Sequence, residues 1–137
     1  MPAQLFGLIS YLLVFVVILP FAAINLLIVK TDLLPNIKSF IISTGSMDPS
    51  IPRGSIIYTL TQKNYKVGDV IAYRDSIGRV THRIKDTVFI GDTKYFITKG
   101  DANKINDDQL IPEENIYGKT VAAIPYFGEG ILILKNF

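Results

Sequence analysis

The sequence contains no cysteine, only one histidine, and no run of lysine and arginine. The absence of cysteine excludes disulfides, zinc–thiolate centres and thiol nucleophiles, and it fits either an oxidising or a reducing compartment. Basic and acidic side chains are nearly balanced, at 14 and 12, with a net charge of +2. Without a concentrated basic region, a nucleic-acid partner is not expected.

Hydrophobic residues, by contrast, make up 49% of the chain, and the mean hydropathy is +0.34, a combination that is high for a wholly soluble protein. Residues 5–29 contain no charged side chain, and as a helix they are long enough to cross a bilayer core of about 30 Å. Pro20 lies inside this run and is expected to bend the helix. A cleavable export signal would have a basic n-region and a shorter apolar stretch. The sequence therefore predicts a retained transmembrane anchor over residues 1–30, followed by one domain over residues 31–137.

The pattern changes after Asn36 to short apolar runs separated by turn residues. These runs are rich in β-branched and aromatic residues, and pairs such as Gly-Asp punctuate them. We expect strands at residues 37–44, 54–61, 68–75, 78–84, 86–91, 94–100 and 118–126. The fold class predicted is mainly β, with mostly antiparallel pairing. The last apolar stretch, residues 130–134, is too short for a second span, and it fits either a segment at the membrane interface or a final strand over the core.

A candidate nucleophile, Ser46, lies after a glycine and before a methionine in residues 43–52. Prolines in this segment restrict the backbone, so the serine is held in a defined position. On its own the segment is more typical of an ordinary loop, because serine and glycine are common turn residues.

The single histidine, His82, lies in the expected strand 78–84. Alternation along a strand places Val80, His82 and Ile84 on one face, so the imidazole shares an apolar face. A lone histidine in such a place is usually a core residue. General-base activation of a serine would also require a histidine, so the catalytic interpretations of Ser46 and His82 support each other.

A loop rich in glycine, asparagine and aspartate covers residues 98–108. In a Ser-His-Asp arrangement a carboxylate holds the histidine tautomer and stabilises the imidazolium. Asp101, Asp107 and Asp108 are the candidates for that carboxylate. The alternatives are a solvated acidic turn or a calcium loop with Asp101, Asn103 and Asp107 as ligands, although the regular EF-hand spacing is absent.

Five segments, in this order, closely resemble the type I signal peptidases: STGSMDPSIPRGS, GDVIAY, RVTHRI, TKGDANKINDD and IYGKTVAAIPYFG. The resemblance covers nearly the whole chain, and it is to the endoplasmic-reticulum and archaeal branch, which is also found in some Gram-positive bacteria. That branch uses histidine where the common bacterial enzymes use a catalytic lysine, and His82 lies at that position. The resemblance implies a membrane-bound serine endopeptidase that cleaves signal peptides from secreted and membrane preproteins, with one transmembrane helix before an antiparallel β catalytic domain.

The resemblance also implies a role for each residue that matches a family motif. Ser46 matches the nucleophile and His82 the general base. Asp107 and Asp101 match two aspartates that the family requires, and we predict that Asp107 is the acid of the triad while Asp101 holds the loop. Asp108 is expected to be dispensable, and no metal or organic cofactor is needed.

The oxyanion hole is predicted to consist of the Ser46 N–H and the Thr44 hydroxyl. Thr44 stands where the family usually has serine. A threonine hydroxyl donates the same hydrogen bond, while the methyl group restricts its χ1 angle.

Substrates of this family have small side chains at the −1 and −3 positions before the cleavage site. We expect that stretch to lie extended against strand edges near residues 40–42 and 77–80, by β-augmentation. The candidates for the walls of the substrate pockets are Ile41, Ile42 and Met47.

The orientation in the membrane is indicated by two signals that disagree. Lys30 and Lys38 follow the expected span, which weakly favours a cytoplasmic domain. The resemblance implies an extracytoplasmic or lumenal domain, and we adopt it because the cleavage site is exposed only after translocation. The expected location is single-pass in the cell membrane, or in the endoplasmic reticulum membrane of a eukaryote. Expected partners are preproteins with signal peptides, the lipid bilayer, and other signal peptidase or translocon subunits.

Two other functions compete with this interpretation. A self-cleaving repressor-type Ser/Lys peptidase has a related β fold, but it is soluble and would need lysine in place of His82. A membrane-tethered β module that binds a partner would have Ser46 and His82 as structural residues only. Such a module would keep its function without Ser46.

Overall fold

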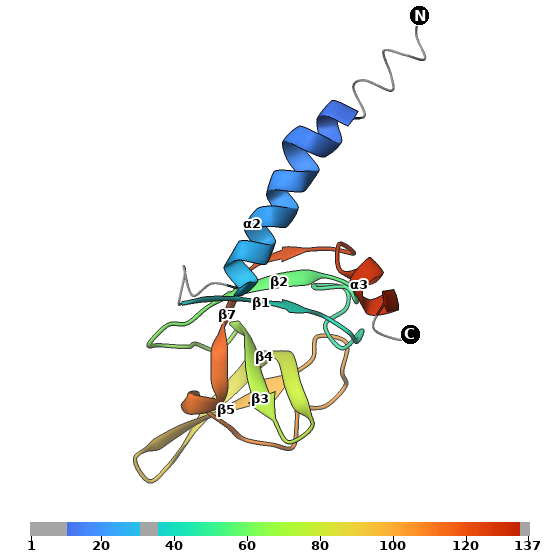
Figure 1. Ribbon diagram of the computed structural model, residues 1–137. Coiled ribbons are helices and arrows are strands. Elements are labelled where there is room, and N and C mark those ends of the chain that lie inside the picture. The colour runs from blue at the N-terminus through green and yellow to red at the C-terminus, as the bar shows by residue number, and fades with distance from the viewer. Residues whose placement is uncertain (1–10, 31–35, 135–137) are drawn as a thin grey trace, which may run out of the picture. The chain divides into compact units, whose positions relative to one another are not determined.

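The computed structural model describes residues 11–30 and 36–134. The chain divides into two units, residues 1–35 and residues 36–137, and each is described by itself. Figure 1 shows a helix in the first unit and a β-sheet in the second.

The described part of the first unit is helical. A π-helical stretch, η1 (Val14–Ile18), leads directly into the α-helix α2 (Leu19–Lys30). The irregular stretch precedes Pro20, which has no N–H to donate to the carbonyl of Val16 inside η1. None of the helices in the described ranges has both the length and the hydropathy needed to cross a membrane. Residues 5–10 of the expected span lie outside the described residues.

The second unit contains one seven-stranded sheet. Its strands are β1 (Ile37–Ile41), β2 (Ile56–Leu60), β3 (Val70–Asp75), β4 (Gly78–Ile90), β5 (Thr93–Lys99), β6 (Ile111–Pro112) and β7 (Ile116–Ile124). The strands lie in the order β1-β2-β7-β3-β4-β5-β6, and each neighbouring pair is antiparallel. The expectation of a mainly antiparallel β fold is confirmed.

Several details of the strands differ from the expectation. The expected strands 78–84 and 86–91 are one long strand, β4, with an irregularity between Ile84 and Asp86. A bulge of this kind interrupts the alternation of side chains without ending the strand, which is why the pattern suggested two strands. The short strand β6 was not expected, because two residues are too few to give a periodic pattern.

Two short helices complete the second unit. A 3₁₀ turn, η2 (Glu113–Asn115), joins β6 to β7, and the α-helix α3 (Glu129–Leu134) follows β7. The interpretation of residues 130–134 as a final strand is therefore wrong. A short run of consecutive apolar residues has no alternation, so it does not distinguish a strand from a helix.

The buried apolar side chains form two clusters. Core cluster 1 consists of Tyr65, Ile71, Tyr73, Ile84, Phe96, Ile111 and Ile116. Core cluster 2 consists of Ile42, Met47, Ile51, Ile57 and Ala72. Strand β3 contributes to both, since Ile71 and Tyr73 point to one face of the strand and Ala72 to the other. The sheet is therefore packed on both faces at β3.

Candidate active site

Ser46 lies in the loop of residues 42–55, which connects β1 to β2. Backbone hydrogen bonds close the base of the loop, with the Ile42 N–H donating to Ser55 (2.9 Å) and the Gly54 N–H donating to Ile42 (2.8 Å). The residue after the serine, Met47, is 0% exposed and packs in core cluster 2. Burial of Met47 therefore anchors the loop and leaves the neighbouring serine half-buried at its surface.

The backbone of Ser46 is also held by residues 100–102. The Ala102 N–H donates a hydrogen bond of 2.9 Å to the Ser46 carbonyl. A Cβ atom on Gly100 would lie 2.5 Å from that same carbonyl oxygen, so glycine is required for the two segments to approach this closely. The loop after β5 therefore positions the serine through main-chain contacts.

His82 lies in β4, opposite Ile71 of β3, and is 8% exposed. As the alternation indicates, it shares a face with Val80 and Ile84, both of which pack in or against core cluster 1. Its Nε2 atom lies 3.1 Å from the Ser46 Oγ atom. The strand thus presents the imidazole to the serine at hydrogen-bonding distance.

Asp107 lies on the other side of the imidazole. Its Oδ2 atom is 2.6 Å from His82 Nδ1, and its backbone N–H donates to the Thr98 carbonyl at 2.8 Å. An ionised carboxylate only accepts hydrogen bonds, so Nδ1 carries the proton in this pair. In a neutral ring Nε2 is then unprotonated and accepts a hydrogen bond from the Ser46 hydroxyl. The three side chains form a continuous chain from hydroxyl to imidazole to carboxylate.

Two further hydroxyls reach the same carboxylate, and sequence reasoning missed both. Thr98 Oγ1 donates to Asp107 Oδ2 at 2.7 Å, and the Tyr73 hydroxyl lies 3.3 Å from that oxygen and 3.0 Å from Thr98 Oγ1. Burial raises the pKa of Tyr73. The sequence held one signal for Thr98. It lies two residues after Phe96, on the face of strand 94–100 where an apolar residue is expected.

Asp101 lies away from the imidazole and pairs with Arg83. Arg83 Nε donates to Oδ1 at 2.8 Å and Nη2 donates to Oδ2 at 2.6 Å, while Nη1 donates to the Gly68 carbonyl at 2.8 Å. The Arg83 hydrogen bonds lower the pKa of Asp101 to about 2. His82 and Arg83 are adjacent in β4 and point to opposite faces, so the two aspartates have different partners. Asp108 is exposed.

The calcium-loop alternative required Asp101, Asn103 and Asp107 to share one ion. Asp101 instead pairs with Arg83 and Asp107 with His82. Within residues 11–30 and 36–134, no group of three or more His, Cys, Asp or Glu side chains is arranged to hold a metal ion.

The remaining predicted site residues lie around the serine. Thr44 is exposed, and its Oγ1 atom is 3.2 Å from Ser46 Oγ. Ile41 is half-buried, whereas Ile42 and Met47 are buried in core cluster 2. The oxyanion-hole and pocket-wall roles stay predictions.

The two strand edges that we expected to bind substrate are close to each other. β1 lies at one end of the sheet, and the β4–β5 ladder begins only at Arg83, so residues 78–82 pair with β3 on one side. The Arg79 guanidinium carbon lies 5.5 Å from the centre of the Phe40 ring, which joins β4 to β1. The two edges are therefore near each other, and the addition of an extended peptide to them stays a prediction.

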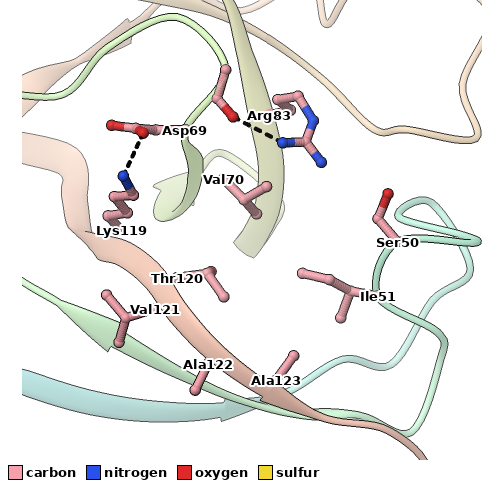
Figure 2. A pocket seen from close by; sticks show the side chains of 11 residues that line it. Ser50, Ile51, Asp69, Val70, Arg83, Lys119, Thr120, Val121, Ala122 and Ala123 are labelled. Atoms are coloured by element: carbon pink, nitrogen blue, oxygen red, sulfur yellow. Dashed lines mark hydrogen bonds and ion pairs between the residues drawn. The ribbon is translucent and has the colours of Figure 1, made fainter.

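A separate pocket of about 370 Å³ lies near β3 and β7 (Figure 2). Ser50 and Ile51 line one side, and residues 119–123 of β7 line the opposite side. An ion pair of 2.7 Å between Lys119 and Asp69 lies at its margin. Ser46, His82 and Asp107 are not among its lining residues, so this pocket is distinct from the serine–histidine pair.

No family model matches the chain. Curated relatives do match: "Signal peptidase complex catalytic subunit SEC11" of Fusarium vanettenii is 28% identical over 108 residues, covering 70% of this chain and 63% of the relative. The proteins of the same name from Candida tropicalis and Scheffersomyces stipitis are 29% and 30% identical over 109 residues, covering 70% of this chain and 65% of each relative. The chain thus spans a little under two thirds of the length of these relatives. The resemblance to the endoplasmic-reticulum branch of signal peptidases is confirmed.

Proposed function

Because the chain is a homologue of signal peptidase catalytic subunits, we propose that it is a membrane-bound serine endopeptidase that removes N-terminal signal peptides from secreted and membrane preproteins. The observation that carries the proposal is the hydrogen-bonded series Ser46 Oγ, His82 and Asp107, with distances of 3.1 Å and 2.6 Å. A serine is a weak nucleophile until a neighbouring base accepts its proton. This series supplies that base and a carboxylate to orient it.

In the proposed mechanism, the Ser46 Oγ atom attacks the scissile carbonyl while its proton passes to His82 Nε2. The Asp107 carboxylate stabilises the imidazolium that forms. His82 then returns the proton to the leaving amine, which carries away the mature protein, and an ester joins the signal peptide to Ser46. Water, activated by the same imidazole, hydrolyses this ester and restores the serine.

The negative charge on the carbonyl oxygen needs hydrogen-bond donors during both attacks. We assign this role to the Ser46 N–H and the Thr44 hydroxyl. The Thr44 Oγ1 atom lies 3.2 Å from the Ser46 Oγ atom, which supports the assignment because the Thr44 hydroxyl is close to the atom that attacks the carbonyl. Asp101 would act at a distance, through the Arg83 pair that holds the loop against the Ser46 carbonyl.

The substrate is proposed to lie extended between the edge of β1 and residues 78–82. Ile41, Ile42 and Met47 would form the apolar walls that accept the small side chains at −1 and −3. Ile42 and Met47 are buried in core cluster 2, so they would act by fixing the shape of the surface above them.

We further propose that residues 1–30 anchor the protein in a membrane and that residues 31–137 form the catalytic domain on the extracytoplasmic or lumenal side. The absence of charge in residues 5–29 supports the anchor. The membrane is the cell membrane, or that of the endoplasmic reticulum in a eukaryote. The relatives are named as subunits of a complex, so other signal peptidase or translocon subunits are expected partners, besides preproteins and lipid.

The test is cleavage of a labelled preprotein by the full chain in detergent or liposomes. Ser46→Ala and His82→Ala are each expected to lower kcat by more than about 10⁴-fold, with circular dichroism unchanged. Ser43→Ala, an exposed serine of the same loop, is the matched control and should cleave normally. His82→Lys tests the Ser/Lys alternative and should be inactive.

Normal cleavage by Ser46→Ala would contradict the proposal. Activity in His82→Lys would show that a lysine at this position can replace the histidine base. A wild-type chain that binds a preprotein without cutting it would favour the partner-binding module.

A further inference from the structure

We propose that the hydroxyls of Tyr73 and Thr98 are positioning groups that hold the Asp107 carboxylate against His82 and so keep the imidazole in its Nδ1–H tautomer. The inference rests on the proposed function for its catalytic meaning. Its structural part concerns the arrangement of four side chains and is testable without substrate.

The contacts converge on one carboxylate oxygen. Asp107 Oδ2 lies 2.6 Å from His82 Nδ1, 2.7 Å from Thr98 Oγ1 and 3.3 Å from the Tyr73 hydroxyl. The Tyr73 and Thr98 hydroxyls are also 3.0 Å apart. When the Thr98 hydroxyl donates to the carboxylate, Thr98 Oγ1 can accept a hydrogen bond from the Tyr73 hydroxyl, so both hydroxyls in the group have an acceptor.

The positions of the two hydroxyls are unusual for polar groups. Tyr73 is 1% exposed and Thr98 is 0% exposed, and Tyr73 belongs to core cluster 1. A buried hydroxyl is unfavourable unless it is hydrogen-bonded. Phenylalanine and valine would fill the same space without that requirement, and the hydrogen bonds to Asp107 account for the polar groups being there.

Asp107 needs such support because it is only partly enclosed. Its side chain is 22% exposed, compared with 10% for the His82 side chain. A carboxylate at the edge of the site is free to turn toward water when its inner oxygen loses donors. Tyr73 lies in β3 and Thr98 in β5, the two strands that flank β4. These strands therefore hold the Asp107 carboxylate, which comes from a loop, against His82 in β4.

The imidazole tautomer is the property that follows from this arrangement. A carboxylate that stays at Nδ1 keeps the proton there and leaves Nε2 to accept from Ser46. When the carboxylate turns away, the proton is free to move to Nε2, and the ring then no longer accepts the serine proton.

The single histidine of the chain makes this measurable, because ¹⁵N-histidine labelling yields one imidazole signal set. In the full chain in detergent, above the pH at which the ring becomes neutral, the nitrogen shifts report the fraction of each tautomer. Thr98→Val and Tyr73→Phe are expected to lower the Nδ1–H fraction, with Thr98→Val the larger change. Thr98→Ser keeps the hydroxyl and should restore the wild-type spectrum.

The matched controls are buried hydroxyls that form their hydrogen bonds with groups other than Asp107. Thr59, which is 0% exposed, donates to the Lys38 carbonyl, and the Tyr65 hydroxyl, in a residue 3% exposed, accepts from the Gln62 N–H. Thr59→Val and Tyr65→Phe should leave the tautomer ratio unchanged. A merely structural role for the Tyr73 and Thr98 hydroxyls would make all four variants alike.

Kinetics provide the second readout. Thr98→Val is expected to lower kcat by about 10²-fold and Tyr73→Phe by about tenfold, each with an unchanged KM. Because both hydroxyls act through the carboxylate, neither change should lower kcat further in an Asp107→Asn background.

The two parts of the experiment fail separately. An unchanged tautomer ratio in folded Thr98→Val and Tyr73→Phe overturns the positioning role, even if the wild type cleaves preproteins. A shifted ratio in a protein that does not cleave them supports the positioning role and contradicts the proposed function. If Thr98→Val does not fold, Tyr73→Phe decides the question alone.

Discussion

The proposed nucleophile and the proposed base–acid pair are held in place by different kinds of contact. Ser46 lies in a loop whose next residue, Met47, is buried in core cluster 2. His82 lies in a long strand, and its carboxylate partner is held by hydroxyls from the strands on either side. Apolar burial and a main-chain hydrogen bond from Ala102 therefore position the serine, whereas side-chain hydrogen bonds position the Asp107 carboxylate.

Because of this difference, mutations in the Ser46 loop and mutations around His82 should have different effects on folding and activity. The 42–55 loop has few ladder hydrogen bonds, so losing its apolar anchor should disturb the fold and the serine together. Strands β3, β4 and β5 are paired through their backbones whether or not Asp107 reaches His82. Losing the polar network should therefore impair the chemistry and leave the fold intact.

Among the variants that test this comparison, Asp107→Asn should have the largest effect, and it tests the polar region. An amide donates its N–H groups toward Nδ1 and so favours the wrong imidazole tautomer, and the loss in kcat should be about 10⁴-fold. Asp108→Asn, the exposed neighbour, is the matched control and should cleave a preprotein at the wild-type rate. If both variants lose the same activity, Asp107 is not the acid. The claim that hydrogen bonds hold the acid against His82 would then be wrong.

The apolar region is tested by Met47→Ala. Removing a fully buried side chain from core cluster 2 should lower the free energy of unfolding by about 2–5 kcal/mol, measured by urea denaturation. Met47→Leu nearly conserves the volume and should cost less than about 1.5 kcal/mol. A stable Met47→Ala protein with a displaced, inactive Ser46 would show that burial shapes the loop without stabilising the fold.

The smallest expected effect is a change in stability on replacing Asp101. Asp101 lies in the 100–102 segment, which contacts the Ser46 backbone and belongs to the same loop as Asp107. Its pKa is lowered from 3.8 to about 2 by the Arg83 hydrogen bonds. A lowered pKa means that the pair stabilises the folded state above pH 4, and that this stability is lost as the pH falls from about 4 toward 2. The midpoint of thermal unfolding should therefore fall less steeply over this range in Asp101→Asn than in the wild type. Equal slopes would show that the pair does not stabilise the folded state.

The local features of the fold were predictable because they depend on neighbouring residues. Short apolar runs between turn residues identified the strands, and alternation placed His82 with Val80 and Ile84 on an apolar face. The same method divided β4 in two at its bulge and missed β6, because both depend on pairing with other strands. For the site, the resemblance named Ser46, His82 and Asp107, and the structure brings these three together.

The sequence by itself determined which chemical groups are available: no thiol, one imidazole, and three aspartates in the loop of residues 98–108. It also determined that residues 5–29 carry no charge. Only the tertiary structure decided which aspartate meets the imidazole, since His82 and Arg83 point to opposite faces of β4 and each takes a different partner. It also decided that the Tyr73 and Thr98 hydroxyls reach the Asp107 carboxylate. Their contacts join residues 9 to 34 positions apart, and such distances are closed by the antiparallel pairing of β3, β4 and β5.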